Sequence, residues 1–360
     1  MSGKNKGEWT ELYSFFKTMH EKKILLADKN LNVSNCNNFL SVTKVSTLNI
    51  EKLFHLRLGD RVIVESETTG KKKEIHISNF INENVLSRLF SKITNGTGSS
   101  FNIPEFNSIQ GKLNVDIKKG GTSNQKADIV LDIKNSAIEK ENEGFSIKSA
   151  VGKDPTLLNA SLQTNFIYEV EGLAAEHLGV VNSITTGQKI KKRIKKIQEL
   201  DGSFKYIAID SSNMSYNLSM VDSIIPKLLS QMLLSFFVER NASIKLNLKK
   251  LYNSGCLSNF TNEDLQSFTV KIKRLLVSIL LGFFPGKRWD GKNIANGVII
   301  VKKNGEQVGL HVIDTPALEN YLFENSRFET PSSSKHKYGE LYECDDKIHL
   351  KFNLQLRLGV

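Results

Sequence analysis

Two short stretches of alternating apolar and polar residues, 126–133 and 144–150, constrain the fold of this chain more than any other feature. "KADIVLDI" and "GFSIKSA" have the two-residue period of half-buried β-strands, and the polar tract "KNSAIEKENE" joins them. We therefore expect an antiparallel hairpin, with a loop of about ten residues that is longer than usual.

Further strands and helices are expected before this hairpin. Apolar residues recur at helical spacing over about residues 7–20, which predicts an amphipathic helix. Alternating strands are expected at 39–47, 61–66 and 73–77, and a helix at 83–93.

The part after Pro155 is expected to be mainly helical. Thr156 is a plausible N-cap for a helical "TLLNASLQTNFIYEVEGL". The stretch "TTGQKIKKRIKKIQEL" predicts a basic amphipathic helix, with isoleucines on one face and six Lys and Arg residues around them. Residues 220–284 are rich in Leu, Ile and Phe at helical spacing, which favours a helical subdomain that forms much of the core.

β-structure should return near the C-terminus. The Asn304–Gly305 pair stands between two apolar runs, and Asn-Gly is typical of the tight turns of β-hairpins. A helix in "PALENYLFENSRF" and strands in "KIHLKFNLQLRLGV" should follow.

The chain is basic, with 49 Lys and Arg against 38 Asp and Glu, a net charge of +11. A pI near 9.3 favours a polyanionic partner, because each phosphate that a protein contacts releases condensed counterions. Nucleic acid is the natural candidate, although many basic proteins bind none.

Cysteines and apolar runs indicate a cytoplasmic protein. The three cysteines are far apart and form no CxxC or zinc-type cluster, so reduced, buried thiols are expected. The N-terminus lacks the apolar run of a secretory leader, and no apolar stretch approaches the length of a membrane span. HxxxH and GxxxxGK[ST] patterns are also absent from the sequence, which disfavours zinc and ATP chemistry.

Asp128 and Lys148 are the first candidates for chemistry. If the two strands of the hairpin pair, Asp128 can meet Ser146 and Lys148, which share one face of the second strand. A carboxylate and a main-chain oxygen, here the carbonyl of Ile147, can hold Mg²⁺, and a nearby lysine can stabilise a charged phosphate. The alternative is a cross-strand ion pair on a solvated face.

Glu11 is a second candidate carboxylate. It follows Gly7 by four residues on one helical face, where the glycine lets that face approach a sheet closely. Glu8 competes with it for the same role, and both acids can instead be solvated groups in a first helical turn.

Together these residues resemble the PD-(D/E)xK nuclease pattern, with Ala127 in place of the usual proline and Ser146 in place of the second acid. More specifically, the chain resembles the HpaII-type family of type II restriction endonucleases. The stretches that carry the resemblance are "NKGEWTELY", "GFSIKSAVGKDPTLLNASLQTNFIYEV", "TPSSSKHKYGELY" and "LKFNLQLRL".

The resemblance implies Mg²⁺-dependent cleavage of double-stranded DNA at a short palindrome, CCGG for the family's namesake, with 5′-phosphate ends. It implies Asp128 as metal ligand and Lys148 as catalytic lysine, with Glu11 as the helix acid. Ser146 departs from the pattern, so Glu11 is expected to supply the missing charge, with Ile147 as a further metal ligand. A homodimer and a cognate DNA methyltransferase are further partners that it suggests.

Two segments are candidates for contacting DNA. The loop "TPSSSKHKYGELY" offers polar groups suited to phosphates and base edges, namely Ser334, Lys335, His336, Lys337 and Tyr338. Asn159, Thr164 and Asn165 follow the candidate catalytic strand, where a helix N-terminus can meet a phosphate. A plain surface loop and an Asn cap or turn are the respective alternatives.

We therefore expect an α/β (α+β) fold with a PD-(D/E)xK-like mixed sheet flanked by helices. Three consecutive parts are expected: a nuclease core over 1–165, a mainly helical subdomain over 166–290, and a DNA-contacting C-terminal part over 291–360. Two rival functions remain open at this point: a catalytically silent DNA-binding protein on the same fold, and a structure-selective repair nuclease.

Overall fold

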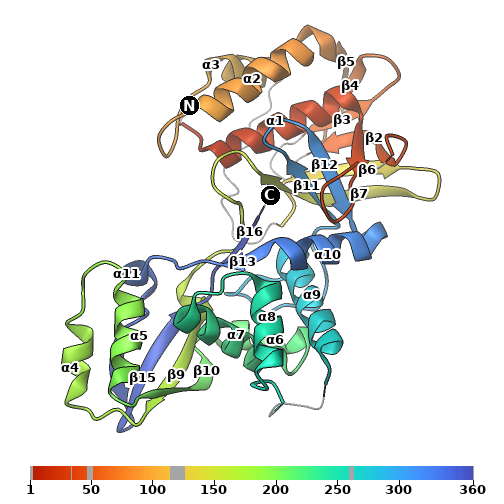
Figure 1. Cartoon of the computed structure of the whole chain (residues 1–360). Coiled ribbons are helices and arrows are strands. Elements are labelled where there is room, and N and C mark those ends of the chain that lie inside the picture. The colour runs from red at the N-terminus through yellow and green to blue at the C-terminus, as the bar shows by residue number, and fades with distance from the viewer. Residues whose placement is uncertain (1–2, 34, 47–51, 114–125, 259–262, 360) are drawn as a thin grey trace. The chain divides into compact units, whose positions relative to one another are not determined.

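The computed structural model describes residues 3–33, 35–46, 52–113, 126–258 and 263–359 of the chain (Figure 1). It is a mixed α/β protein that divides into two compact units. Unit 1 comprises Met1–Pro155 and Asn293–Tyr321, and unit 2 comprises Thr156–Lys292 and Leu322–Gly359. Each unit therefore combines segments that are distant in sequence, and residues 293–321 belong with the N-terminal part rather than with the C-terminal one.

Unit 1 contains most of the N-terminal elements and one late hairpin. Its elements are α1 (Lys6–Glu21), β1 (Lys23–Leu26), β2 (Phe39–Ser46), β3 (Lys52–Leu56), β4 (Arg61–Ser66), β5 (Lys72–His76), η1 (Ile77–Asn79), α2 (Glu83–Asn95), α3 (Pro104–Leu113), β6 (Ile129–Lys134), β7 (Glu139–Ser149), β11 (Gly297–Val301), β12 (Gln307–His311) and η3 (Val312–Asp314). The helix α10 (Thr315–Asn325) leads from unit 1 into unit 2.

One sheet organises unit 1. Its strand order is β1-β12-β11-β7-β6-β2-β3-β4-β5, and β1 also pairs with β2. Strand β7 is central, parallel to β11 on one side and antiparallel to β6 on the other. The predicted hairpins β6–β7 and β11–β12 are both confirmed, and the second one turns at Asn304–Gly305 as expected.

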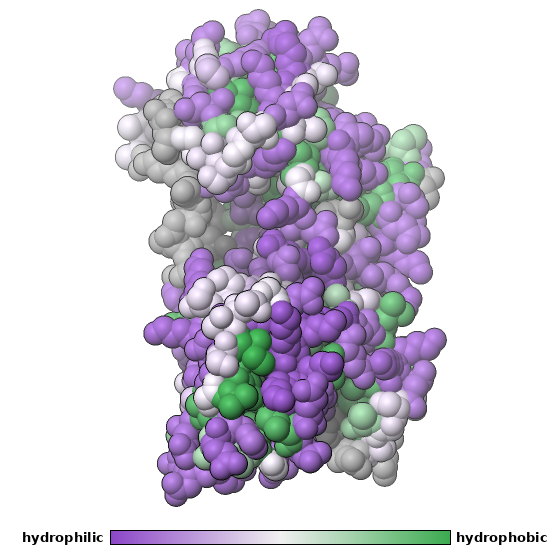
Figure 2. Space-filling model, turned by 60° about the vertical axis from the view of Figure 1, so that its left-hand side comes forward, coloured by the Kyte–Doolittle hydropathy of each residue, from purple (hydrophilic) through white to green (hydrophobic). Residues whose placement is uncertain are grey.

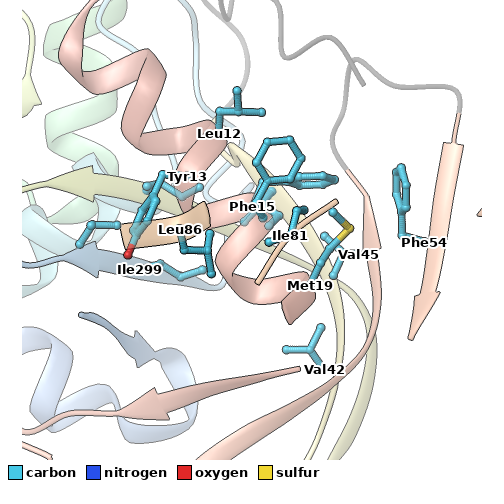
Figure 3. Close-up of a cluster of buried hydrophobic side chains, with 14 of the residues drawn as sticks. Leu12, Tyr13, Phe15, Met19, Val42, Val45, Phe54, Ile81, Leu86 and Ile299 are labelled. Atoms are coloured by element: carbon cyan, nitrogen blue, oxygen red, sulfur yellow. The ribbon is translucent and has the colours of Figure 1, made fainter. Parts of the chain in front are cut away.

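Helix α1 packs its apolar face against this sheet. A capping box between Asn5 and Glu8 begins the helix, and Lys22 ends it in a left-handed conformation. Figure 3 shows side chains of α1, among them Leu12 and Phe15, among apolar side chains of the neighbouring strands and of α2. The predicted helix over 7–20 is confirmed, and its burial fixes α1 on the sheet.

The loop between β6 and β7 is shorter than the ten residues expected. β7 begins at Glu139, so most of the polar tract extends the strand instead of forming a loop. This part of β7 is solvent-exposed, which is why the sequence shows no apolar alternation there. Asn135 closes the turn, because its side chain accepts hydrogen bonds from the N–H groups of Ala137 and Ile138 at 2.9 Å each.

Unit 2 contains two smaller sheets and a group of helices. Its elements are β8 (Thr156–Leu158), η2 (Leu162–Thr164), β9 (Asn165–Glu171), α4 (His177–Asn182), α5 (Lys189–Glu199), β10 (Ser203–Ile209), α6 (Ser212–Val221), α7 (Ile225–Glu239), α8 (Ile244–Asn253), α9 (Leu265–Leu281), β13 (Ser326–Phe328), α11 (Ser333–His336), β14 (Leu341–Cys344), β15 (Lys347–Asn353) and β16 (Leu356–Leu358). The sheets have the orders β10-β9-β15-β14 and β13-β16-β8.

The helical prediction for residues 156–173 is wrong. This segment forms β8, a short 3-10 turn and β9 instead, because β9 finds a strand partner on each side, β10 and β15. Thr156 is therefore no N-cap, and its hydroxyl accepts a hydrogen bond from Arg357 on β16. The basic helix α5 forms as predicted, and α7, α8 and α9 lie within 220–284, where helices were expected.

The cysteines are more exposed than expected, and the surface shown in Figure 2 is mainly hydrophilic. All three cysteines are free but exposed, not buried. Figure 2 shows a face on which hydrophilic residues dominate and hydrophobic ones gather in small groups.

Within the described ranges no single helix is long and apolar enough to cross a membrane. Helices α6 and α7, bent by 108° to each other, pass the test of length and composition only as a pair.

Candidate active site

Asp128 lies in unit 1, immediately before β6 and across from Ser146. The antiparallel register ends with Ile129 opposite Phe145, and the N–H of Asp128, in the bend just before the strand, donates to the Phe145 carbonyl at 2.8 Å. The Asp128 carboxylate accepts two hydrogen bonds at Oδ2, from the Ile147 N–H at 2.6 Å and from the Ser146 hydroxyl at 3.2 Å. The main chain and side chain of β7 therefore orient this carboxylate.

Lys148 follows on the same strand and acts on Asp128 through its charge. Burial raises the pKa of Asp128, while the Lys148 ammonium and the two hydrogen bonds from β7 oppose that rise. Lys148 is thus within electrostatic range of the carboxylate, as the predicted hairpin requires.

Glu11 joins this group from α1. The pKa of Glu11 is raised to about 8, mainly by burial and then by the charge of Asp128, while the charge of Lys148 opposes the rise. A hydrogen bond of 3.0 Å from the Ser149 hydroxyl to the Thr10 hydroxyl ties α1 to β7 beside this point. Glu11, Asp128 and Lys148 therefore converge from three different elements.

Glu8 has a different role. Its carboxylate accepts a hydrogen bond of 2.8 Å from the Asn5 N–H, which completes the capping box of α1. Its charge still contributes to the raised pKa of Glu11. Of the two acids that the sequence left open, the geometry brings Glu11 to Asp128 and Lys148 and occupies Glu8 at the helix end.

The sequence reasoning missed Lys126. It is half-buried two residues before Asp128, and burial together with the charge of Lys148 lowers its pKa to about 7. The strand pairing ends at Ile129 and Phe145, so the hairpin pattern in the sequence did not point to Lys126.

The donor set suits a hard divalent cation. The charge of Asp128 raises the pKa of Glu11, and a cation bound by the two carboxylates would relieve that repulsion. Mg²⁺ needs only one or two protein carboxylates, since water and substrate phosphate complete its octahedron. Within the described residues, no group of three or more His, Cys, Asp or Glu side chains is placed to hold a metal. The Ile147 carbonyl as a ligand stays a prediction.

Part of the candidate DNA loop is exposed in unit 2. Ser334 and Lys335 lie on the short helix α11, and Lys337 follows in a left-handed conformation with φ of 50°. His336 and Tyr338 are instead buried, and the Tyr338 hydroxyl donates to the Pro331 carbonyl at 2.7 Å. Only Ser334, Lys335 and Lys337 are therefore available to a phosphate.

The second DNA segment is mostly a scaffold. Thr164 and Asn165 are buried, and both hydrogen-bond to Asn353 on β15, at 3.3 Å and 2.6 Å. The Asn165 amide also donates to the His336 carbonyl at 3.0 Å. Their polar groups are thus occupied inside unit 2, contrary to the expectation of DNA contacts, and only Asn159 is exposed.

Helix α5 holds the exposed loop in place. Arg193 is buried, although the sequence placed it on a solvated basic face, and it donates to the carbonyls of Asn182, Ile184 and Gly339. Gly339 has a φ of +80°, and a Cβ there would collide with Ile190 of α5. A surface hollow of about 560 Å³ lies beside this contact. Its lining includes Lys189, Ser334, Lys337, Tyr342 and Lys351.

Comparison with known proteins agrees with the resemblance seen in the sequence. The family model described as HpaII restriction endonuclease matches residues 5–358. The type II restriction enzyme HpaII of Haemophilus parainfluenzae is 30% identical over 366 residues, which cover 98% of each chain. No solved structure matches the chain significantly.

Proposed function

Because this chain belongs to the HpaII restriction endonuclease family and is thereby a type II site-specific deoxyribonuclease, we propose that it cuts double-stranded DNA at a short CCGG-like palindrome. We further propose that it uses Mg²⁺ and leaves 5′-phosphate ends. The observation that carries this proposal is the convergence of Glu11, Asp128 and Lys148 in unit 1.

Each residue has a distinct part in the proposed reaction. Asp128 and Glu11 would hold Mg²⁺, which polarises the scissile phosphate and acidifies water when it is bound. Lys148 would place its ammonium beside the phosphate and stabilise the negative charge that grows as water attacks. Ser146 donates to Asp128 and so keeps that carboxylate turned toward the shared point.

The proposed site is a variant of the PD-(D/E)xK arrangement. The second acid of that pattern is absent from β7, where Ser146 stands, and Glu11 on α1, on which the charges of Asp128 and Lys148 act, would supply the missing carboxylate. The family assignment favours this reading over the two rivals, a silent DNA-binding protein and a structure-selective repair nuclease.

The proposal extends to partners and location. Cutting both strands of a palindrome is simplest for a two-fold homodimer, and protection of the host's own sites calls for a methyltransferase of the same specificity. A cytoplasmic location is consistent with the free cysteines and with a DNA substrate. Sedimentation with and without a palindromic duplex would measure the oligomeric state.

One experiment tests the core of the proposal. Purified protein is incubated with a large DNA of known sequence and Mg²⁺, and the ends of all fragments are sequenced. We expect 5′-phosphate ends at one short palindrome, and no cutting when EDTA removes the metal. Ends spread over unrelated sequences, or cutting that prefers branched DNA, would contradict it.

A further inference from the structure

A short loop that follows α9 in unit 2, residues 284–292, is held by the helix α6. Asn217 of α6 is fully buried and hydrogen-bonds to the main chain of this loop at three points. Its amide N–H groups donate to the carbonyls of Phe284 and Lys287 at 3.0 Å and 2.7 Å, and its side-chain oxygen accepts from the Trp289 N–H at 2.8 Å. One buried side chain therefore fixes the path of the loop over 284–289.

Further hydrogen bonds complete this support. The Asn213 amide, one turn earlier in α6, donates to the Gly286 carbonyl at 3.0 Å. The indole N–H of Trp289 donates to the Lys292 carbonyl at 2.7 Å and closes the last part of the loop. The loop therefore has a defined conformation, although residues 286–288 are exposed to solvent.

Arg288 is exposed in this loop and is oriented by an aromatic ring. Its guanidinium stacks on the half-buried Tyr216 of α6, with 3.8 Å between the guanidinium carbon and the ring centroid. Stacking occupies a face of the guanidinium, whereas its N–H donors point outward in the guanidinium plane. Among the residues that the structure describes, none forms an ion pair or a hydrogen bond with this guanidinium. Its orientation is thus set while its donors stay free for a ligand.

Two other arginines of unit 2 are used differently. Arg193 is buried and donates to three main-chain carbonyls. Arg357 donates to the Glu329 carboxylate and to the Thr156 hydroxyl. Both hold the scaffold of the unit together, and Arg288 has no such partner.

An oriented guanidinium with free donors suits two acceptors that lie side by side. In DNA these are the oxygens of a phosphate, or the O6 and N7 atoms of guanine in the major groove. A phosphate contact needs charge more than orientation, and the exposed Lys287 and Lys292 of the same loop can supply that charge. Base reading needs the orientation, because it depends on geometry and because a pre-organised side chain loses less entropy on binding. Arg288 therefore fits a base edge better than a phosphate.

We propose that Arg288 reads a guanine of the recognition palindrome through O6 and N7, and that Tyr216 and Asn217 are the positioning residues for this contact. The inference rests on the proposed function and deepens it by naming a residue that determines specificity. Because both half-sites of a palindrome contain the same guanine, two copies of the chain would make the same contact.

A ratio of affinities gives the first test. Affinity is measured without Mg²⁺, in EDTA and again with Ca²⁺, for a duplex that contains CCGG and for duplexes in which one G·C pair of each half-site is changed to A·T. Arg288→Ala should lower the preference for CCGG about tenfold or more. Arg288→Lys should lose nearly as much, because it keeps the charge but lacks the two-pronged donor set.

Two variants control for charge. Lys287→Ala removes the neighbouring charge of the same loop, so any loss of affinity should be equal for all duplexes and the ratio should stay within twofold. Arg88→Ala removes an exposed arginine of unit 1 whose guanidinium is already paired with Glu105 at 2.7 Å, and it should leave the ratio unchanged. Thermal unfolding of each variant identifies any that fails to fold.

A modified base locates the contact. In 7-deazaguanine the N7 acceptor is replaced by a C–H group while Watson–Crick pairing is kept. One duplex carries it at the first guanine of both CCGG strands, and another carries it at the second. At one of the two positions the losses from Arg288→Ala and from the modified base should be strongly non-additive, and at the other they should add.

The stacked ring can be tested separately. Tyr216→Leu removes the stacking partner of Arg288 and should lower the preference for CCGG a few-fold. Tyr216→Phe keeps the ring and should keep the preference. Equal ratios in Tyr216→Leu and in the unchanged protein would overturn the positioning role of Tyr216.

The outcomes distinguish this inference from the proposed function. An unchanged preference in folded Arg288→Ala, additive losses at both guanines, or equal affinity of the unchanged protein for all duplexes in both buffers would overturn the role of Arg288, even where the unchanged protein still cuts. A protein with an Arg288-dependent preference for CCGG that cuts no DNA with Mg²⁺ would overturn the proposed nuclease activity and leave the guanine contact standing.

Discussion

The two units treat buried charge in opposite ways. In unit 1, Glu11 and Asp128 are both half-buried carboxylates, the charge of Asp128 acts on Glu11, and the pKa of each carboxyl is raised. In unit 2, the buried cation Arg193 donates to three main-chain carbonyls, and the buried Asn165 is hydrogen-bonded on both sides of its amide. Fully satisfied polar groups build a scaffold, whereas groups left in electrostatic conflict mark a place where a ligand completes the arrangement.

The largest expected effect comes from Lys148→Ala. Removal of the ammonium beside the phosphate should lower the single-turnover cutting rate by about a thousandfold, because the growing negative charge loses its stabilising partner. Affinity for the duplex should fall by no more than about tenfold, since one phosphate contact is lost. A rate near that of the unchanged protein would remove Lys148 from the chemistry.

Glu11→Gln should rank next. We expect cutting to fall about a hundredfold and the Mg²⁺ concentration for half-maximal activity to rise, because a carboxylate is exchanged for a neutral amide. Glu8→Gln is the control: it weakens the cap of α1 but should leave the Mg²⁺ dependence in place. If Glu8→Gln changed the Mg²⁺ dependence and Glu11→Gln did not, Glu8 would be the helix acid.

Arg193→Ala tests the scaffold of unit 2. The free energy of unfolding should fall by about 3 kcal/mol, because three buried carbonyls lose their donor and the space of the side chain is left empty. Chemical denaturation measures this loss, and Lys191→Ala on the exposed face of α5 should change it little. Equal stability of both variants would contradict the scaffold role.

Ser146→Ala should have a smaller effect on cutting. The variant removes one hydrogen bond to Asp128 and keeps the stronger one from the Ile147 N–H. A loss of about 1 kcal/mol in transition-state stabilisation corresponds to a rate five- to tenfold lower. A loss as large as that of Lys148→Ala would mean that the hydroxyl itself takes part in the reaction.

Lys335→Ala and Lys337→Ala should have the smallest effects. Each removes one exposed charge of the α11 loop, so DNA affinity should fall a few-fold and the salt slope by about 0.9 per lysine that contacts a phosphate. The cutting rate at saturating protein should not change. Salt slopes equal to that of the unchanged protein would place the DNA elsewhere on unit 2.

Local patterns in the sequence were enough to predict which side chains meet in the candidate site. Asp128, Ser146 and Lys148 follow from strand alternation and a nearby antiparallel partner, and Glu11 follows from the helical period of α1. The distinction between Glu8 and Glu11 depended on the capping geometry of α1.

The errors have a common physical origin in distant contacts. β9 is a strand because β15 pairs with it, and β15 lies far away in the sequence. The Asn353 amide at the end of β15 also donates to the carbonyl of Ser161, which lies 192 residues earlier in the chain. Thr164 and Asn165 look like free polar groups until Asn353 is placed beside them. The secondary-structure propensity of a segment does not contain such information, because pairing with a distant strand overrides it.

The order of the strands in unit 1 also has a consequence for the protein while it is being made. β7, which carries Lys148, receives its parallel neighbour β11 only after the ribosome has passed the whole of Thr156–Lys292. Until then one edge of β7 in the nascent chain is unpaired, and contacts of such sequence separation form late. A nuclease built in this way stays unfinished in interrupted or truncated translation products, which limits the damage that fragments can do to the genome of the cell that makes them.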